Sequence, residues 1–171
     1  MTTLSRHVRV LGGIAEGDAA AWDALVPDDN PFLEHAFLLA LERSGSASAV
    51  QGWVPMHLVV EEAGAVIAAL PLYLRGDSYG EYIFDWAWAN GAKRAGIPYY
   101  PKFTTAVPFT PSSTGRLLGD TTAIPLLSEA VAALAGKIGA SSHHVLFCTE
   151  AESAALATCG YQSRISMQFH W

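Results

Sequence analysis

The segment TAIPLLSEAVAALAGKIGASSHHVLFCT, residues 122–149, carries the strongest helix signal in the chain and a strand signal directly after it. Apolar residues recur in it at three- and four-residue spacing: Ile124, Leu127, Val131, Leu134 and Ile138. This spacing predicts a helix with one buried face, which Thr122 can cap at its start and Gly139 at its end. The apolar run 145–149 predicts a buried strand, so the segment indicates a helix–strand unit of an α/β protein.

Upstream residues extend this unit into a sheet. Residues 56–62 and 66–75 are rich in Val, Ile and Leu and predict a hairpin whose turn is Ala63-Gly64. Residues 102–109 predict the strand that precedes the helix. Together with the helix and the strand at 145–149, it makes a strand–turn–helix–strand unit at 102–149.

The rest of the chain supplies flanking elements. These are a strand at 7–10, helices at 18–26, 30–45, 151–158 and the second half of 76–96, and a strand at 165–169. Asn30 as N-cap and Pro31 at the first helical position start the longest of these helices. The order predicts one domain, residues 1–171, of the α/β (α+β) class, with a mixed, mostly antiparallel central sheet flanked by helices.

Composition excludes several classes of protein. The chain has 171 residues, of which 51% are apolar and 15% charged, and this excludes a disordered chain. The net charge of −6 excludes nucleic-acid binding by bulk charge. Two cysteines are too few for a disulfide scaffold and lack metal-ligand spacing, so no metal is expected.

The sequence also shows no membrane or export signal. No apolar run reaches the roughly 18 residues that a membrane span needs, so no span is expected. The N-terminus MTTLSRH lacks the apolar segment of a signal peptide. We therefore expect a cytoplasmic protein.

Three segments carry a family resemblance: SYGEYIFDWAWA (78–89), YYPKF (99–103) and VPFTPSSTGRLL (107–118). Together with NPFL (30–33) and QFHW (168–171), they resemble bacterial FemAB-like proteins, predicted N-acyltransferases of the GNAT superfamily. The resemblance implies a GNAT-like fold and transfer of an acyl group from a coenzyme A thioester, or of an aminoacyl group from charged tRNA, to the amine of a small molecule or peptide. Because members of the family carry a second GNAT-like half, residues 1–171 are expected to be the N-terminal half of a longer architecture.

The loop before the long helix is the expected donor site. Its residues expected to bind acyl-coenzyme A are Pro111, Ser112, Ser113, Thr114, Gly115, Arg116 and Leu117. A glycine-containing loop at a helix N-terminus offers backbone N–H groups to a pyrophosphate, and Arg116 would add a charge-assisted contact. The alternative is a plain strand-to-helix turn that needs Gly and Pro for its geometry.

Glu81 and Asp85 are the candidate catalytic residues. They lie four apart among aromatic residues, and on a helix they would share a face. Burial there would raise a carboxyl pKa toward that of a general base for amine acylation. The alternative is that both carboxylates pair with Lys93, Arg94 or Lys102 and organise the fold.

Aromatic residues beside these carboxylates are the candidate substrate-binding residues: Tyr82, Trp86, Trp88, Tyr99 and Tyr100. They would line an acceptor or acyl pocket. The alternatives are that they form core or an interface.

Three other candidates have simpler interpretations. His143 and His144 point to opposite faces of an extended segment, which excludes joint metal binding and suggests a solvated pair. Cys148 is expected to be a small core residue. His170 would be a site residue only if another chain or domain completed the site.

The low charge, the aromatic block at 79–100 and the terminal strand favour self-association, with residues 161–171 near the contact. The acidic charge disfavours tRNA as the donor. A non-catalytic half-domain that binds a partner or has a structural role remains the alternative to an enzyme.

Overall fold

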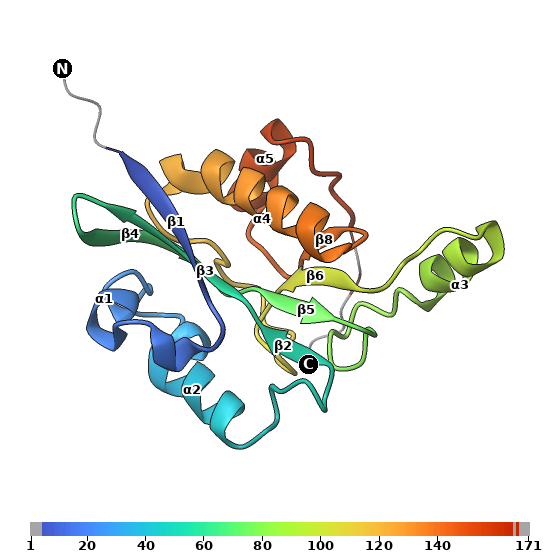
Figure 1. The fold of residues 1–171 in the computed structure, drawn as a ribbon, viewed down its shortest axis with the longest axis horizontal. Coiled ribbons are helices and arrows are strands. Elements are labelled where there is room, and N and C mark those ends of the chain that lie inside the picture. The colour runs from blue at the N-terminus through green and yellow to red at the C-terminus, as the bar shows by residue number, and fades with distance from the viewer. Residues whose placement is uncertain (1–4, 166, 168–171) are drawn as a thin grey trace.

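The computed structural model describes residues 5–165 and 167. In this part of the chain, strands form two four-stranded sheets flanked by helices (Figure 1). The strands are β1 (Arg6–Leu11), β2 (Trp53–Pro55), β3 (His57–Glu62), β4 (Ala65–Leu70), β5 (Tyr73–Arg75), β6 (Lys102–Thr105), β7 (Leu118–Gly119) and β8 (His143–Val145). The α-helices are α1 (Ala19–Asp23), α2 (His35–Arg43), α3 (Trp86–Ala95), α4 (Ile124–Ile138) and α5 (Glu150–Thr158).

One long hairpin joins the two sheets. Its first arm is β2 followed by β3, and its second arm is β4 followed by β5, so each arm contributes to both sheets. The Met56 N–H donates to the Leu72 carbonyl at 2.8 Å where the arms pass from one sheet to the other. The strand orders are β1-β3-β4-β7 and β2-β5-β6-β8. All pairs are antiparallel except β6 with β8, which confirms a mixed, mostly antiparallel sheet.

Helices cover both faces of the sheets (Figure 1), with α1 and α2 on one side and α4 and α5 on the other. Alternate residues of β3 supply the two cores, because successive side chains of a strand point to opposite faces. Val59 belongs to the cluster that contains Trp22 of α1 and Leu38 of α2. Val60 belongs to the cluster that contains Leu127 of α4.

Several local signals are confirmed. Asp18 caps α1, accepting from the Ala21 N–H at 2.9 Å. Ala63 and Gly64 have φ of 51° and 82°, the positive values that a tight hairpin turn requires. Gly139 ends α4 in the left-handed conformation.

The predicted helix 30–45 is interrupted. Pro31–Leu33 form a 3-10 turn, Glu34 is extended with φ −59° and ψ 142°, and α2 begins at His35. The Asn30 side chain does not cap this helix. Its Nδ2 donates instead to the Gly115 carbonyl at 3.1 Å, a contact that local sequence could not indicate.

Strand ends also differ from the prediction. The strand predicted at 145–149 is β8 at 143–145, because Phe147 has a φ of 55° and turns the chain toward α5. The strand predicted at 102–109 ends at Thr105. Within the strand predicted at 165–169, Ile165 and Met167 are not in a strand, and the other residues lie outside the described ones.

The start of the long helix is capped differently too. The Asp120 carboxylate, rather than Thr122, caps the 3-10 turn that leads into α4 and accepts from the Thr122 N–H at 2.8 Å.

One helix in the described part of the chain, Thr121–Ile138, is long and apolar enough to cross a membrane by length and composition, with a mean hydropathy of 1.2. The expectation that no stretch would reach this length is therefore wrong. Its buried residues Leu127 and Val131 pack in the core cluster under the sheet. Only 22% of the apolar window is buried, so the helix packs on the core through one face.

Candidate functional site

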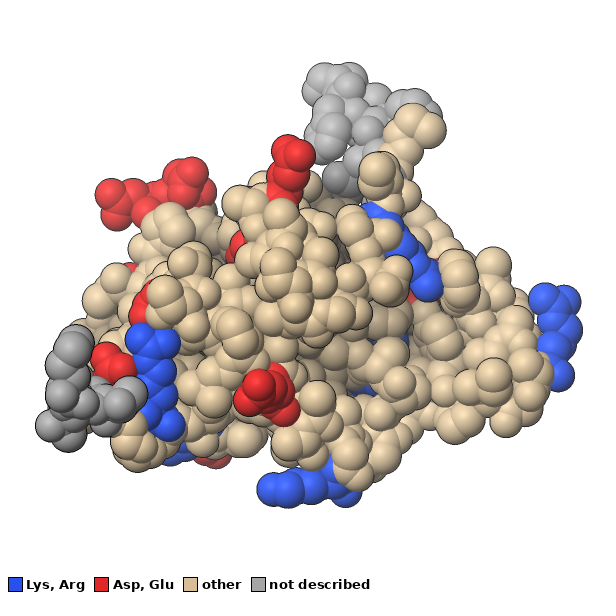
Figure 2. All heavy atoms as spheres, turned by 90° about the horizontal axis from the view of Figure 1, so that it is seen from above, with Lys and Arg blue, Asp and Glu red and all other residues tan. Residues whose placement is uncertain are grey.

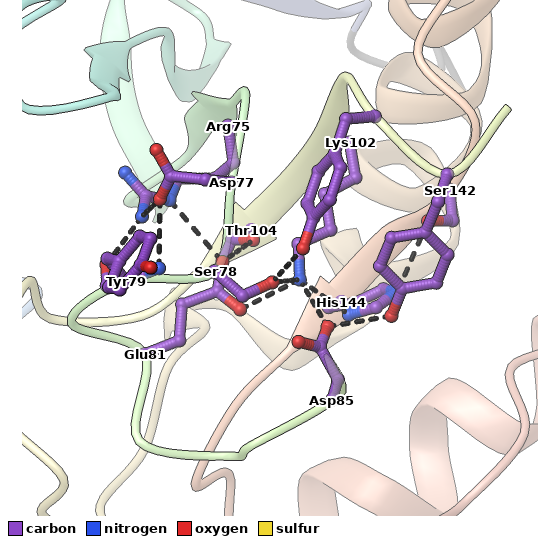
Figure 3. A network of polar contacts seen from close by, with 12 residues as sticks. Arg75, Asp77, Ser78, Tyr79, Glu81, Asp85, Lys102, Thr104, Ser142 and His144 are labelled. Carbon is purple, nitrogen blue, oxygen red and sulfur yellow. Dashed lines mark hydrogen bonds and ion pairs between the residues drawn. The ribbon is translucent and has the colours of Figure 1, made fainter. Parts of the chain in front are cut away.

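Polar side chains gather on one face of the sheet β2-β5-β6-β8 (Figure 3). Arg75 lies on β5, Lys102 and Thr104 on β6, and His144 on β8. Arg75 is the cross-strand partner of Lys102, and Thr104 is that of His144. Lys102 and Thr104 are two apart in one strand, so all four side chains share a face of the sheet. Residues 76–85, which follow β5, run over them and contribute the acidic partners.

Lys102 is the centre of this cluster and is fully buried. Its Nζ donates to Ser78 Oγ and Glu81 Oε2 at 2.8 Å and to Asp85 Oδ2 at 2.7 Å. An ammonium has three N–H groups, and these three oxygens account for all of them. Lys102 therefore ties the covering loop to the sheet.

Glu81 has both oxygens committed. Oε1 accepts from Thr104 Oγ1 at 2.9 Å and from Arg75 Nε at 3.3 Å, while Oε2 accepts from Lys102. Arg75 also pairs with Asp77 at 3.1 Å, and its Cζ lies 3.7 Å from the centre of the Trp53 ring. Glu81 thus links β5, β6 and the loop.

Asp85 differs in having one uncommitted oxygen. Oδ2 accepts from Lys102 and from the Tyr99 hydroxyl, both at 2.7 Å. Oδ1 is buried and has no hydrogen-bond partner among the described residues. Burial would raise the pKa of this carboxyl, but the hydrogen bonds from Lys102 and Tyr99 outweigh burial and lower it. Asp85 is therefore an ionised carboxylate with one enclosed oxygen that has no partner among the described residues.

The two adjacent histidines serve different faces of β8. Burial and the charge of Lys102 lower the pKa of His144 to about 4, so its ring is neutral at pH 7. Its Nδ1 lies 3.4 Å from Lys102 Nζ, which can only donate, so the ring proton belongs on Nε2, 3.1 Å from Ser142 Oγ. Burial lowers the pKa of His143 to about 3, and this ring bonds Thr105 and Tyr161. The pair is on opposite faces as predicted, but it is not a solvated pair.

The candidate catalytic residues Glu81 and Asp85 come together around Lys102, but not on a helix, because α3 begins at Trp86. Of the cations named as alternative partners, Lys102 pairs with both carboxylates, whereas Lys93 and Arg94 are exposed on α3. The expected rise in pKa is wrong for Asp85. A catalytic role for either residue stays a prediction.

The covering loop contains strained backbone. Tyr82 and Phe84 have φ of 59° and 51°, a region that bulky residues rarely adopt. Gly80 has a φ of 79°, and a Cβ placed there would lie 2.5 Å from Cε1 of Phe109. Such strain persists only where surrounding contacts impose it, and here the ion pairs of Glu81 and Asp85 do so.

The expected donor loop, residues 111–117, is occupied by the chain itself. The Glu152 carboxylate oxygen Oε1 accepts from the backbone N–H groups of Arg116 at 2.6 Å and Leu117 at 2.7 Å. The Thr114 N–H donates to the Phe147 carbonyl at 3.1 Å. In this conformation these N–H groups are not offered to a phosphate.

Arg116 is used internally as well. It is fully buried, and its guanidinium donates to the Leu146 carbonyl at 2.9 Å, to Thr114 Oγ1 at 2.5 Å and to the Ser112 carbonyl. In this conformation Arg116 is committed to these internal contacts, and a contact between Arg116 and a pyrophosphate stays a prediction. Residues 111–117 do not fit a coenzyme A pyrophosphate unless the loop rearranges.

The candidate substrate-binding aromatics are mostly exposed, so they are not core. Trp88 and Tyr99 line an open groove of about 430 Å³ along α3. Its other walls are Ala87, Gly91, Ala92, Ala95 and Ile97. Tyr100 instead shares a 2.8 Å hydrogen bond with Ser78, Trp86 packs on Tyr79, and Tyr82 is exposed.

Sequence reasoning missed Arg75, Thr104, His144 and Glu152. Arg75 and Thr104 occupy strand positions, and polar residues there in a chain with little charge are a signal of a buried network. Glu152 could have been found, because Thr149 and Glu152 form the Thr-x-x-Glu pattern of a capping box, which the structure contains. Among the described residues, no group of three or more His, Cys, Asp or Glu is placed to hold a metal ion.

A mixed sheet with one parallel strand pair, joined across the long helix α4, places the chain in the GNAT-like class of folds. It is similar over 98% of its length to the crystal structure of a GCN5-related N-acetyltransferase from Ralstonia eutropha JMP134, with 16% identity, a TM-score of 0.52 and 99% of that chain covered. At this identity the similarity shows the shared fold.

The chain belongs to the FemAB-like family, described as peptidoglycan biosynthesis/recognition, whose sequence profile matches residues 13–171. No curated protein matches the chain. The family and fold that the segments 78–89, 99–103 and 107–118 indicated are thereby confirmed.

Proposed function

We propose that this chain is an acyl- or aminoacyl-transferase domain whose acceptor is an amine held at Asp85. The observation that carries the proposal is Asp85 Oδ1, a buried oxygen of an ionised carboxylate that has no hydrogen-bond partner among residues 5–165 and 167. Buried polar atoms are normally hydrogen-bonded, and a protonated amine supplies both the N–H donor and the opposite charge. Membership of the FemAB-like family supports the reaction class.

The groove on α3 offers room for the rest of the acceptor. One of its walls is Tyr99, whose hydroxyl donates to the other oxygen of Asp85, so a single side chain separates the groove from the carboxylate. Apolar and aromatic walls such as these are typical of a small-molecule site. This supports an acceptor with an apolar part next to its amine.

Each carboxylate then has a distinct role. Acyl transfer requires the amine to lose a proton around the attack. Asp85 orients the amine as its ammonium, and its lowered pKa means that it does not keep the proton, which passes to solvent. The free amine then attacks the acyl carbon and displaces the thiol of coenzyme A or the hydroxyl of the tRNA. Glu81, with both oxygens committed, is a positioning residue that acts through Lys102 and Arg75.

The donor, a coenzyme A thioester or charged tRNA, is proposed at residues 111–117 in a conformation in which Glu152 has left the N–H groups of Arg116 and Leu117. The net charge of −6 disfavours tRNA, because a polyanion is attracted to a basic surface. A cytoplasmic location is part of this proposal, and cell fractionation would test it.

A second candidate function is a non-catalytic half-domain that binds or organises a partner. The occupied donor loop favours it, since the N–H groups expected to bind a phosphate are bonded to Glu152. In that case residues 1–171 act as the N-terminal half of a longer architecture.

Two calorimetric titrations test the proposal. Nα-acetyl-lysine, which has a free amine, is compared with Nα,Nε-diacetyl-lysine, which does not. We expect preferential binding of the free amine, weakened by about tenfold or more in Asp85→Asn, the size of a lost charged hydrogen bond. Asp77→Asn is the matched control, because Asp77 is a partly exposed carboxylate of the same cluster.

The second titration uses coenzyme A and acetyl-coenzyme A with the wild type and Glu152→Gln. Saturable binding that is stronger in Glu152→Gln supports the donor site. Equal affinity for the two lysine derivatives would overturn the amine site, and no coenzyme A binding in either protein would favour the non-catalytic half-domain.

A further inference from the structure

The segment 79–97, which contains α3 and which we call the arm, is the least covered part of the described chain. Helix α3 lies apart from the sheets and from the other helices (Figure 1), and none of its residues is buried. Large apolar side chains on the arm are exposed: Tyr79, Tyr82, Phe84, Trp86, Trp88 and Ile97. Phe84 is 73% exposed and Tyr79 is 69% exposed. Apolar surface of this extent normally marks an interaction site.

The arm has two faces. Residues three, four or seven apart on a helix share a face. Trp88, Gly91 and Ala95 line the groove described above. Trp86 and Lys93 are seven apart and lie on the opposite side of the helix. Tyr79 extends this second face, since its ring centre lies 5.0 Å from that of Trp86.

We call Tyr79, Trp86, Lys93 and Arg94 the aromatic–basic face, in which Arg94 follows Lys93 in the last turn of α3 and lies at the edge of this side of the helix. Its charge differs in sign from that of the whole protein. The arm contains two acidic and two basic residues, but its acids Glu81 and Asp85 are buried and paired with Lys102. The exposed formal charges of the arm are therefore those of Lys93 and Arg94, on a chain with a net charge of −6. In Figure 2 the right-hand end, where α3 lies, carries basic side chains at its tip.

We propose that the aromatic–basic face docks this domain on an anionic lipid surface. Trp and Tyr suit the headgroup region of a membrane because each ring is amphipathic, and Lys and Arg are attracted to anionic lipids. The acidic remainder of the chain is repelled by the same surface, so the charge asymmetry orients the arm toward it. Two basic and two aromatic residues give weak, reversible binding rather than stable anchoring.

A second copy of the chain fits this face less well. In a twofold contact through the same face, the basic pairs of both copies would approach each other, and the nearby acids are already paired inside each copy. Like charges brought together across a contact oppose association. Self-association through the arm is therefore the competing outcome, and the experiment distinguishes it.

The test is sedimentation of the protein with vesicles of phosphatidylcholine alone or mixed with phosphatidylglycerol, at low and high salt. We expect binding to the mixed vesicles that weakens with salt. In the double variant Lys93→Gln/Arg94→Gln the partition coefficient should fall about tenfold or more, because each basic residue near an anionic surface adds to the free energy of binding. Trp86→Ser should weaken binding at both salt concentrations.

The chain offers a matched control. Arg43→Gln/Lys137→Gln also removes two exposed basic residues from the last turns of helices, but from α2 and α4. This control should bind like the wild type. Circular dichroism of each variant checks that α3 has not been lost through a weaker helix terminus.

Three outcomes would overturn the proposal. The wild type does not bind the mixed vesicles, or it binds both lipid compositions equally. In the third outcome, the control variant loses as much vesicle binding as the arm variants. Light scattering of the same proteins completes the test. A dimer that Trp86→Ser dissociates, without vesicle binding, would assign the face to self-association instead.

Discussion

Replacing Lys102 by methionine is expected to destabilise the fold strongly. The substitution keeps an unbranched side chain of similar length but removes the cation that donates to Ser78, Glu81 and Asp85 at 2.7–2.8 Å. Removing one partner of a buried ion pair leaves an uncompensated charge and typically costs about 3–5 kcal/mol. For a chain of this size that loss lowers the melting temperature by roughly 6–20 °C.

Thermal and urea denaturation measure this loss, with Lys93→Met as control. Lys93 is exposed on α3, so its replacement should change the free energy of unfolding by no more than about 0.5 kcal/mol. A Lys102→Met protein that unfolds within about 1 kcal/mol of the wild type would show that the carboxylates do not depend on this cation.

The pH dependence provides a second check with a defined sign. In the wild type the pKa of Asp85 is lowered, so its contribution to stability is present above the ordinary carboxyl pKa and is lost as the pH falls through the lowered value. Without Lys102 the hydrogen bond from Tyr99 remains, but the strongest influence that lowers the pKa of Asp85 is gone, so burial raises this pKa relative to the wild type. The variant then binds protons more readily when folded, so the stability gap to the wild type should narrow in acid. A gap that stays constant with pH would refute the ion-pair account.

Four other predictions follow from single residues. Glu152→Ala should cost about 2–3 kcal/mol in urea denaturation, because it removes the partner of two backbone N–H groups and half of a capping box. Gly80→Ala should destabilise by about 1–3 kcal/mol, since its Cβ would meet the Phe109 ring at positive φ. Gly136→Ala, at an exposed position in the last turn of α4 where a Cβ meets nothing, should stabilise by about 0.5–1 kcal/mol. Calorimetry that showed both glycine variants stabilised, or both destabilised, would contradict this contrast. The pKa of His144 is about 4 in the folded protein, so between pH 6.5 and 4 this side chain is protonated only in the unfolded chain. The free energy of unfolding should therefore fall by about 1.4 kcal/mol for each pH unit of acidification in this range. In His144→Gln this pH dependence should be weaker by the same amount.

The contacts between elements explain where local signals failed. Asn30 and the proline after it are typical of a helix start. The Asn30 side-chain amide donates instead to the Gly115 carbonyl, 85 residues further along the chain. The glycine-containing loop at 111–117 has the residues of an anion site, but Glu152 fills it from α5. In both cases a partner distant in sequence competes with the local interaction, and no window of sequence contains that partner.

The sequence by itself determined the elements whose signal is a repeat or a turn within a few residues. These include α4 with its apolar stripe, the hairpin that turns at Ala63-Gly64, and the cap of α1 at Asp18. It also identified Lys102 as one possible partner of Glu81 and Asp85. Only the tertiary structure decided that Lys102 holds both carboxylates, that Glu81 is fully committed, and that Asp85 keeps one free oxygen and a lowered pKa. The physical reason is that a pKa and a hydrogen-bond vacancy depend on groups from three strands and a loop, whose distances arise only when the sheet assembles.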